Sequence, residues 1–168
     1  TLEGAKFFFL AVSRLIQKGY PIIIVHAGME QNIYEVMRSV GFPSNHYLGL
    51  GQLSYEQALM AAKDADICSV IINSEEGLGT KVFDYIYLDR PIVAYAPKNS
   101  ELEEVLLPAE NAFICQETEQ MEAAIRIIID ERRDCLTVSS EFKKNFSREI
   151  QNKHYYQILQ EVIKNYKK

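Results

Sequence analysis

The stretch that decides the fold is residues 67–88, which read ICSVIINSEEGLGTKVFDYIYL. Ile67–Ile72 is short and almost wholly apolar, which predicts a strand buried on both faces of a sheet. Residues 73–79 are polar and include two glycines, so they form a loop. A helix follows and runs to about Leu88. The stretch therefore contains a strand, a polar loop and a helix in direct succession.

The same alternation extends through the rest of the chain. Short apolar strands are predicted at 21–25, 47–51, 91–95 and 112–115, and helices at about 2–17, 30–40, 54–65, 102–107, 119–131 and, with breaks, 140–168. Strands alternating with helices at this spacing form βαβ units with right-handed crossovers. The sequence therefore predicts an α/β domain with a Rossmann-like parallel sheet and helices on both faces. We expect one domain over residues 1–168, with C-terminal helices at about 133–168.

Local signals place several helix ends and helix faces. Gly19 and Gly41 are expected to end the first two helices, and Ser54 with Gln57 forms a capping box for the third. An apolar stripe in the first helix contains Phe8, Leu10, Ala11, Leu15 and Ile16, and one in the 119–131 helix contains Met121, Ala124, Ile125 and Ile128. Near the C-terminus, the helical spacing of Tyr155, Tyr156, Ile158, Leu159, Val162 and Ile163 favours core packing over an aromatic platform.

Composition excludes some classes of protein. The 168 residues carry a formal net charge of −5, which gives no reason to expect nucleic-acid binding. No apolar run approaches the ~20 residues that span a bilayer. Cys68 and Cys115 lie in apolar runs and are expected in the core, and with Cys135 they show no metal-ligand spacing. We therefore expect no metal site and a reducing, cytoplasmic setting, with the inner face of the membrane as the alternative.

Candidate ligand contacts gather in the loops that follow the strands, because open parallel sheets bind ligands beyond the carboxyl ends of their strands. These loops are 26–28, 49–53, 73–79 and 96–100. The richest is Asn73–Lys81, where glycines open the backbone and the amides of residues 79–81 begin a helix, an arrangement that favours anions. Lys81 adds a positive charge and Asp84 lies one turn further. From spacing alone, an acidic loop before a well-capped helix explains the pattern equally well.

Several of these motifs together resemble a known family. They are Ala65-Asp66-Ile67, Glu76-Gly77-Leu78-Gly79-Thr80, Asp84 and Arg90-Pro91-Ile92-Val93-Ala94. This combination is similar to the donor-binding C-terminal domain of GT-B retaining glycosyltransferases of group 1 (GT4-like). Gly79–Val82 resembles enzymes of bacterial capsule and surface-polysaccharide synthesis. The strand exit at 48–51 and Phe146-Ser147 also fit, so the resemblance covers most of the chain.

The resemblance implies a role for each matched residue. Glu76 matches the first acid of the family's E-x7-E motif, next to the donor sugar, and is the catalytic candidate. Asp84 matches the second acid, which contacts the ribose, although the family usually has Glu there. The turn at 77–80 matches the segment whose amides hold the diphosphate, and 51–53 the loop at the nucleobase. The implied donor-binding residues are Gly51, Gln52, Leu53, Ser74, Gly77, Leu78, Gly79, Thr80, Lys81 and Asp84.

The implied reaction is hexosyl transfer from a nucleotide-diphosphate sugar, expected to be a UDP-sugar, to a glycan or lipid-linked acceptor. Retention of configuration is expected, with no metal and no cofactor. The family's Arg and Lys at the diphosphate would precede or overlap residues 1–4, and Glu3-Gly4 stands about where the family has Lys-Gly. Because the sequence starts without Met in a helical pattern, we expect a segment of a longer protein. Without the N-terminal acceptor domain, we expect no transfer activity.

Two other classes of function remain as alternatives. A GT-B-like nucleotide-sugar epimerase would need acid and base side chains in the crevice, which the sequence does not identify. A flavodoxin- or receiver-like module would need an acidic cluster or a flavin phosphate loop after the first strand, and His26-Ala27-Gly28 supplies neither. His26 itself is expected to pack or cap rather than to contact a ligand.

Overall fold

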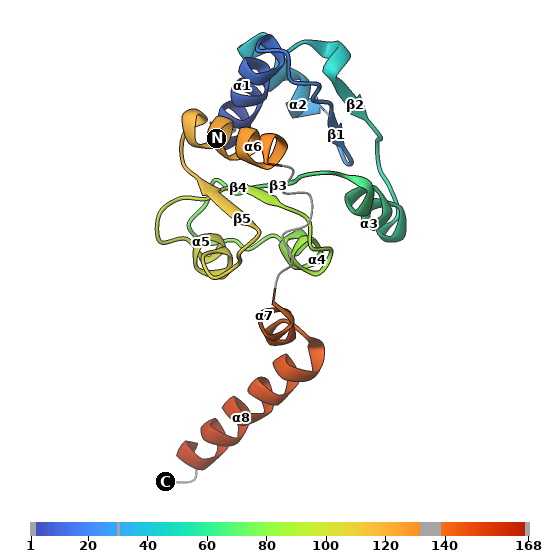
Figure 1. Cartoon of the computed structure of the whole chain (residues 1–168). Helices are drawn as coiled ribbons and strands as arrows, with labels where there is room; N and C mark the ends of the chain where they lie inside the picture. The colour runs from blue at the N-terminus through green and yellow to red at the C-terminus, as the bar shows by residue number, and fades with distance from the viewer. Residues whose placement is uncertain (1–2, 30, 132–138, 167–168) are drawn as a thin grey trace.

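The computed structural model describes residues 3–29, 31–131 and 139–166, and in these strands alternate with helices (Figure 1). The strands are β1 (Ile24–His26), β2 (Tyr47–Gly49), β3 (Cys68–Ile71), β4 (Ile92–Tyr95) and β5 (Ala112–Cys115). The helices are α1 (Glu3–Gln17), α2 (Gln31–Val40), α3 (Tyr55–Asp64), α4 (Lys81–Tyr87), α5 (Glu101–Leu106), α6 (Thr118–Asp130), α7 (Ser140–Asn145) and α8 (Arg148–Tyr166), with a 3₁₀ turn, η1, at Ser44–His46. Leu2, Glu30, residues 133–138 and Lys167-Lys168, which the predicted helices include, lie outside the described residues.

All the strand pairs in the described chain are parallel, as the sequence predicts, but they form two hydrogen-bonded sheets rather than one. β1 pairs with β2, and β4 lies between β3 and β5. The register places Ile24 beside Tyr47 in the smaller sheet and Cys68 beside Ile92 in the larger. The α/β class is confirmed, and the difference lies in the missing pairing between the two sheets.

Helices cover both faces of the three-stranded sheet (Figure 1). The alternation along β4 shows this most clearly: Val93 packs in the core beneath α1 and α6, while Ile92 and Ala94 pack against α4 and α5. All three side chains are at most 1% exposed. The first of these cores also takes in Ile24 and Tyr47 from the smaller sheet, so side chains rather than hydrogen bonds join the two sheets.

The predicted helix ends are confirmed by their backbone geometry. Gly19 has φ +92, and the Tyr20 amide donates to the Leu15 carbonyl at 3.1 Å, which closes α1 as a Schellman motif. Gly41 ends α2 with φ +65 in the same way. Ser54 and Gln57 make both hydrogen bonds of the capping box at the start of α3.

The buried faces of the helices agree with the sequence in α6 and differ in part in α1. The four apolar residues predicted for α6 are all at most 5% exposed. In α1, Ala11 and Leu15 are fully buried, but Phe9 and Val12 share that face while Phe8 and Leu10 lie at its edge. Residues 7–12 are apolar all round the helix, so periodicity alone does not locate the centre of the buried face.

The first predicted strand is wrong in position and in burial. It lies at Ile24–His26 rather than 21–25, and Ile23 and Val25 are 63% and 52% exposed. Leu48, beside Val25 in β2, is 52% exposed as well. One face of this two-stranded sheet packs on α1 and α2, and the other is open. The continuous apolar run at 21–25, which predicts a strand buried on both faces, is therefore buried on one face only.

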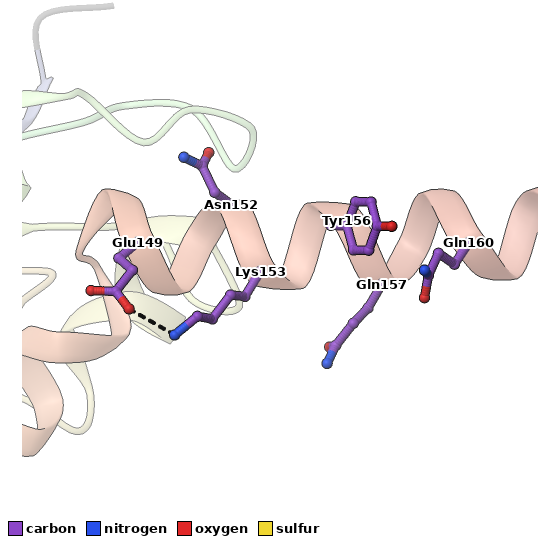
Figure 2. Close-up of a pocket in the computed structure, with 6 residues that line it drawn as sticks. All are labelled: Glu149, Asn152, Lys153, Tyr156, Gln157 and Gln160. Carbon is purple, nitrogen blue, oxygen red and sulfur yellow. Dashed lines mark hydrogen bonds and ion pairs between the residues drawn. The ribbon is translucent and has the colours of Figure 1, made fainter.

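The expectation of core packing for the last helix is also wrong. Tyr155, Tyr156 and Ile158 are 64%, 62% and 58% exposed, because α8 extends away from the sheets (Figure 1). Figure 2 shows a shallow hollow on this helix, lined by Glu149, Asn152, Lys153, Tyr156, Gln157 and Gln160. All six come from one helix, so the hollow cannot surround a ligand. None of the described helices combines the length and apolar character needed to cross a bilayer.

The two cysteines predicted for the core, Cys68 and Cys115, are buried, and burial raises the pKa of each thiol to about 11. Because the thiolate is the reactive form, about one thiol in a thousand is ionised at pH 8. We expect both to resist an aromatic disulfide reagent until the chain unfolds, as followed by absorbance in a Cys135→Ser variant. Cys135 lies outside the described residues. Immediate reaction of both thiols in the native state would contradict this burial.

Candidate functional site

The candidate site lies at the edge where the parallel strands end. Two hydrogen bonds join the loops that leave β1 and β2: the Leu50 amide donates to the His26 carbonyl at 2.8 Å, and the Gly28 amide to the Gly51 carbonyl at 2.7 Å. Gly51 has φ +66, which favours glycine. The His26 ring stacks on Tyr47 with centroids 6.2 Å apart, in agreement with a packing role. The hydrogen bond to Gly28 therefore holds Gly51, the first residue of the predicted nucleobase loop at 51–53, in place.

The Asn73–Lys81 loop is held to two helices. The Gly4 amide at the start of α1 donates to Asn73 Oδ1 at 2.9 Å, and the Glu101 amide of α5 donates to the Glu75 carbonyl at 3.2 Å. Gly77 has φ +148, a conformation that side chains disfavour, and Leu78 packs against the core beneath α4 and α5. These contacts place the loop across the ends of β3 and β4.

The last residues of the Asn73–Lys81 loop lead into α4. Their amides come before the first backbone hydrogen bonds of that helix. Thr80 is the N-cap, in αR conformation, and its side chain makes no capping bond. The first amides to donate in this turn are those of Val82 and Phe83, to the carbonyls of Gly79 and Thr80 at 3.1 and 3.3 Å. The amides of residues 79–81 therefore precede the first hydrogen bonds of this turn, the position at which helices in general present amides to an anion. A Cβ at Gly79 would lie 3.6 Å from Ile72, an ordinary contact, so packing does not require glycine there.

A hydrogen bond links Asp84 to Tyr55, which lies next to the predicted nucleobase loop at 51–53. The Tyr55 hydroxyl donates to Asp84 Oδ1 at 2.9 Å, across 29 positions of sequence. This hydrogen bond is the main cause that raises the pKa of Tyr55. Tyr55 is not among the site residues predicted from the sequence, although its position just after Leu53 and Ser54 makes it a neighbour of the 51–53 loop.

Other predicted site residues show no mutual contact. Ser74, Glu76 and Lys81 are exposed, and so is Gln52. Within the described residues, the Glu76 carboxylate and the Lys81 ammonium take part in no hydrogen bond or ion pair. Both charges remain available to a bound molecule. In the same described ranges, no three His, Cys, Asp or Glu side chains gather in a way that would hold a metal ion.

The N-terminus of α1 also borders the site, close to the end of β4. A Cβ at Gly4 would lie 2.3–2.8 Å from three carbons of the Tyr95 ring, so the ring occupies the space of a side chain. Burial, followed by the charge of Glu3, raises the pKa of Tyr95. The start of α1, which overlaps the region where the resemblance implies the phosphate cations, therefore lies at the strand ends and carries Glu3.

A Gly4→Ala variant is expected to lower the free energy of unfolding by about 1–3 kcal/mol through overpacking against Tyr95. Alanine favours a helix over glycine by at most about 1 kcal/mol, so the clash outweighs the gain. Urea unfolding of Gly4→Ala, of Tyr95→Ala and of the double variant gives the coupling free energy between the two positions. Equal effects of Gly4→Ala with and without the Tyr95 ring would show that the two do not meet.

Comparison with known proteins shows the fold. No protein-family model matches the sequence, and no curated protein matches it. Among solved structures, the chain is similar to sucrose-phosphate synthase from Thermosynechococcus elongatus, with a TM-score of 0.71 at 15% identity. The match covers 96% of this chain and 43% of that one, so the chain spans less than half the length of that structure. The chain thus has the fold of a Rossmann-like domain of the GT-B kind.

Proposed function

We propose that this chain is the donor-binding half of a glycosyltransferase and binds a nucleotide-diphosphate sugar, of which a UDP-sugar is the first choice. The placement of the Asn73–Lys81 loop carries the proposal: it follows a strand of the larger sheet, opens α4, and is held to α1 and α5. Ligands of parallel α/β sheets bind at this edge. The likeness of fold to a structure named as a sucrose-phosphate synthase supports the same class.

The proposed diphosphate contacts are the backbone amides at Gly77, Gly79 and Thr80 and the charge of Lys81. Transfer breaks the bond between the anomeric carbon of the sugar and a diphosphate oxygen, so negative charge grows on the leaving phosphate. Amides at a helix start and a nearby cation stabilise that charge without a metal ion. We therefore propose metal-independent transfer with no cofactor.

The remaining site residues are assigned to the sugar and the nucleoside. Glu76, exposed in the loop and without a hydrogen bond or ion pair to the described residues, is proposed to orient the hydroxyls of the donor sugar through charge-assisted hydrogen bonds. Asp84 is proposed to accept from the ribose, and Gly51, Gln52 and Leu53 to border the nucleobase. Ser74 and Leu78 complete the loop around the donor.

The wider proposal concerns the enzyme that contains this domain. We propose a group 1, retaining hexosyltransferase of surface-polysaccharide synthesis that works in the cytoplasm, with the inner face of the membrane as the alternative, on a glycan or lipid-linked acceptor. The acceptor would bind a second domain of the same protein. Residues 1–168 would form the nucleotide-sugar domain, with C-terminal helices at about 133–168. Transfer would require both domains.

Calorimetric titration of the chain with UDP, GDP and their sugars tests the proposal. Circular dichroism first establishes that the chain is folded, and a chelator removes metal ions. We expect binding of at least one of these nucleotides at micromolar to millimolar concentration, with the same affinity in the chelator. A folded chain that binds none of them at millimolar concentration would contradict the proposed function.

A further inference from the structure

Asp84 has a fixed partner. Its Oδ1 accepts from the Tyr55 hydroxyl at 2.9 Å, which links the first turn of α4 to the first residue of α3. The Asp84 side chain is half-buried, while Tyr55 is 64% exposed. The bond therefore lies at the surface of the proposed site, between the segment beside 51–53 and the helix that follows the Asn73–Lys81 loop.

This hydrogen bond leaves accepting capacity on Asp84. A carboxylate has two oxygens with about four lone-pair positions, and Tyr55 uses one of them. A free aspartate at the start of a helix samples several side-chain rotamers, and a hydroxyl donor on one oxygen restricts that choice. The second oxygen then points in a fixed direction and is able to accept from a diol.

We propose that Tyr55 is a positioning residue that holds the Asp84 carboxylate so that its other oxygen accepts from the hydroxyls of a nucleotide ribose. This inference rests on the proposed function, because it assumes that a nucleotide binds at this edge. It also gives a physical reason why the shorter Asp serves at a position where the resembled family usually has Glu: the tyrosine on α3 fixes the shorter carboxylate in place.

The charges around Tyr55 keep it a donor. The Asp84 hydrogen bond is the largest cause that raises the pKa of its phenol, Glu56 acts in the same direction, and Arg148 at the start of α8 acts in the opposite one. Together these effects raise the pKa of Tyr55 above its ordinary value near 10, so the hydroxyl carries its proton at neutral pH. Arg148 therefore lies within electrostatic range of the Tyr55–Asp84 pair.

Two ligands and four forms of the chain test the inference. UDP and 2′,3′-dideoxy-UDP are titrated calorimetrically into the wild-type chain and into Tyr55→Phe, which keeps the ring and removes only the hydroxyl. We expect Tyr55→Phe to weaken UDP binding about three- to tenfold, the cost of one lost hydrogen bond, and to leave dideoxy-UDP unchanged. Asp84→Asn is expected to reduce the preference for ribose in the same way. Arg38→Gln, at an exposed position of α2, serves as the control.

Each result separates the inference from the proposed function. Wild-type binding with an equal loss for both ligands in Tyr55→Phe would assign Tyr55 to packing and overturn the inference alone. Unchanged binding of UDP by Tyr55→Phe would also overturn it alone. No binding of UDP or GDP by the folded wild-type chain would overturn the proposed function and the inference together. A chain that binds only GDP is tested in the same way with GDP and 2′,3′-dideoxy-GDP.

Discussion

Replacing Leu106 by alanine is expected to lower the free energy of unfolding by about 2–5 kcal/mol. Leu106 is 1% exposed and packs on the α4–α5 side of the three-stranded sheet. The loss combines the transfer free energy of the deleted carbons with the cavity that they leave. A domain of this size is stable by only about 5–15 kcal/mol, so this change removes a large share. Urea unfolding followed by circular dichroism measures it.

The next residue provides a matched control. Leu107 is 74% exposed, so Leu107→Ala deletes the same atoms from solvent and is expected to change the free energy of unfolding by no more than about 0.5 kcal/mol. Equal effects of the two substitutions would show that α5 does not pack on the sheet as described. The comparison tests the core that supports the Asn73–Lys81 loop through Leu78.

Replacing Gly79 by tryptophan is expected to weaken nucleotide binding at least tenfold, which corresponds to about 1.4 kcal/mol. The ring would fill the space in front of the amides at the start of α4. Stability should change little, because Gly79 is exposed, its φ lies outside the left-handed region, and a Cβ there makes only an ordinary contact with Ile72. Calorimetry measures the affinity, and thermal unfolding measures stability.

Two further variants serve as comparisons for Gly79→Trp. Gln157→Trp places the same ring on exposed α8 and is expected to leave the affinity unchanged (Figure 2). Gly77→Ala is expected to lower stability by about 1 kcal/mol or more, because φ +148 strains any side chain. Full nucleotide affinity in a folded Gly79→Trp chain would remove the helix start from the site.

Features that depend on a few neighbouring residues were predictable from the sequence. The capping box at Ser54, the glycine that ends α1 and the buried face of α6 each follow from spacing within one or two turns. The strand and helix order followed for the same reason. The parallel α/β class came from that order, because crossovers between parallel strands require helices.

Features that depend on distant partners were not predictable. Val25 belongs to an apolar run typical of a buried strand, yet none of the described helices covers its side of the two-stranded sheet. Tyr155 has the spacing of a core residue, but α8 leaves the body of the chain (Figure 1). Periodicity shows which residues share a face and carries no information about what packs against that face.

The candidate site divides in the same way. The Asn73–Lys81 loop and its helix start are contiguous in sequence, so their placement at the strand ends followed from the order of elements. The Tyr55–Asp84 hydrogen bond joins the starts of two helices, at residues 29 positions apart, and required the tertiary structure. The space that Tyr95 takes at Gly4 is likewise a contact between distant segments.

The measurement that most directly tests the nucleotide site is a nuclear magnetic resonance titration of the ¹⁵N-labelled chain with UDP and GDP, following every backbone amide. For the nucleotide that binds, we predict saturable shifts at 51–53 and 77–81 and in the first turn of α4, with the amides of α8 beyond Arg148 unchanged. Saturable shifts confined to other surfaces, or no shifts with either nucleotide at millimolar concentration, would contradict a nucleotide site at the strand ends.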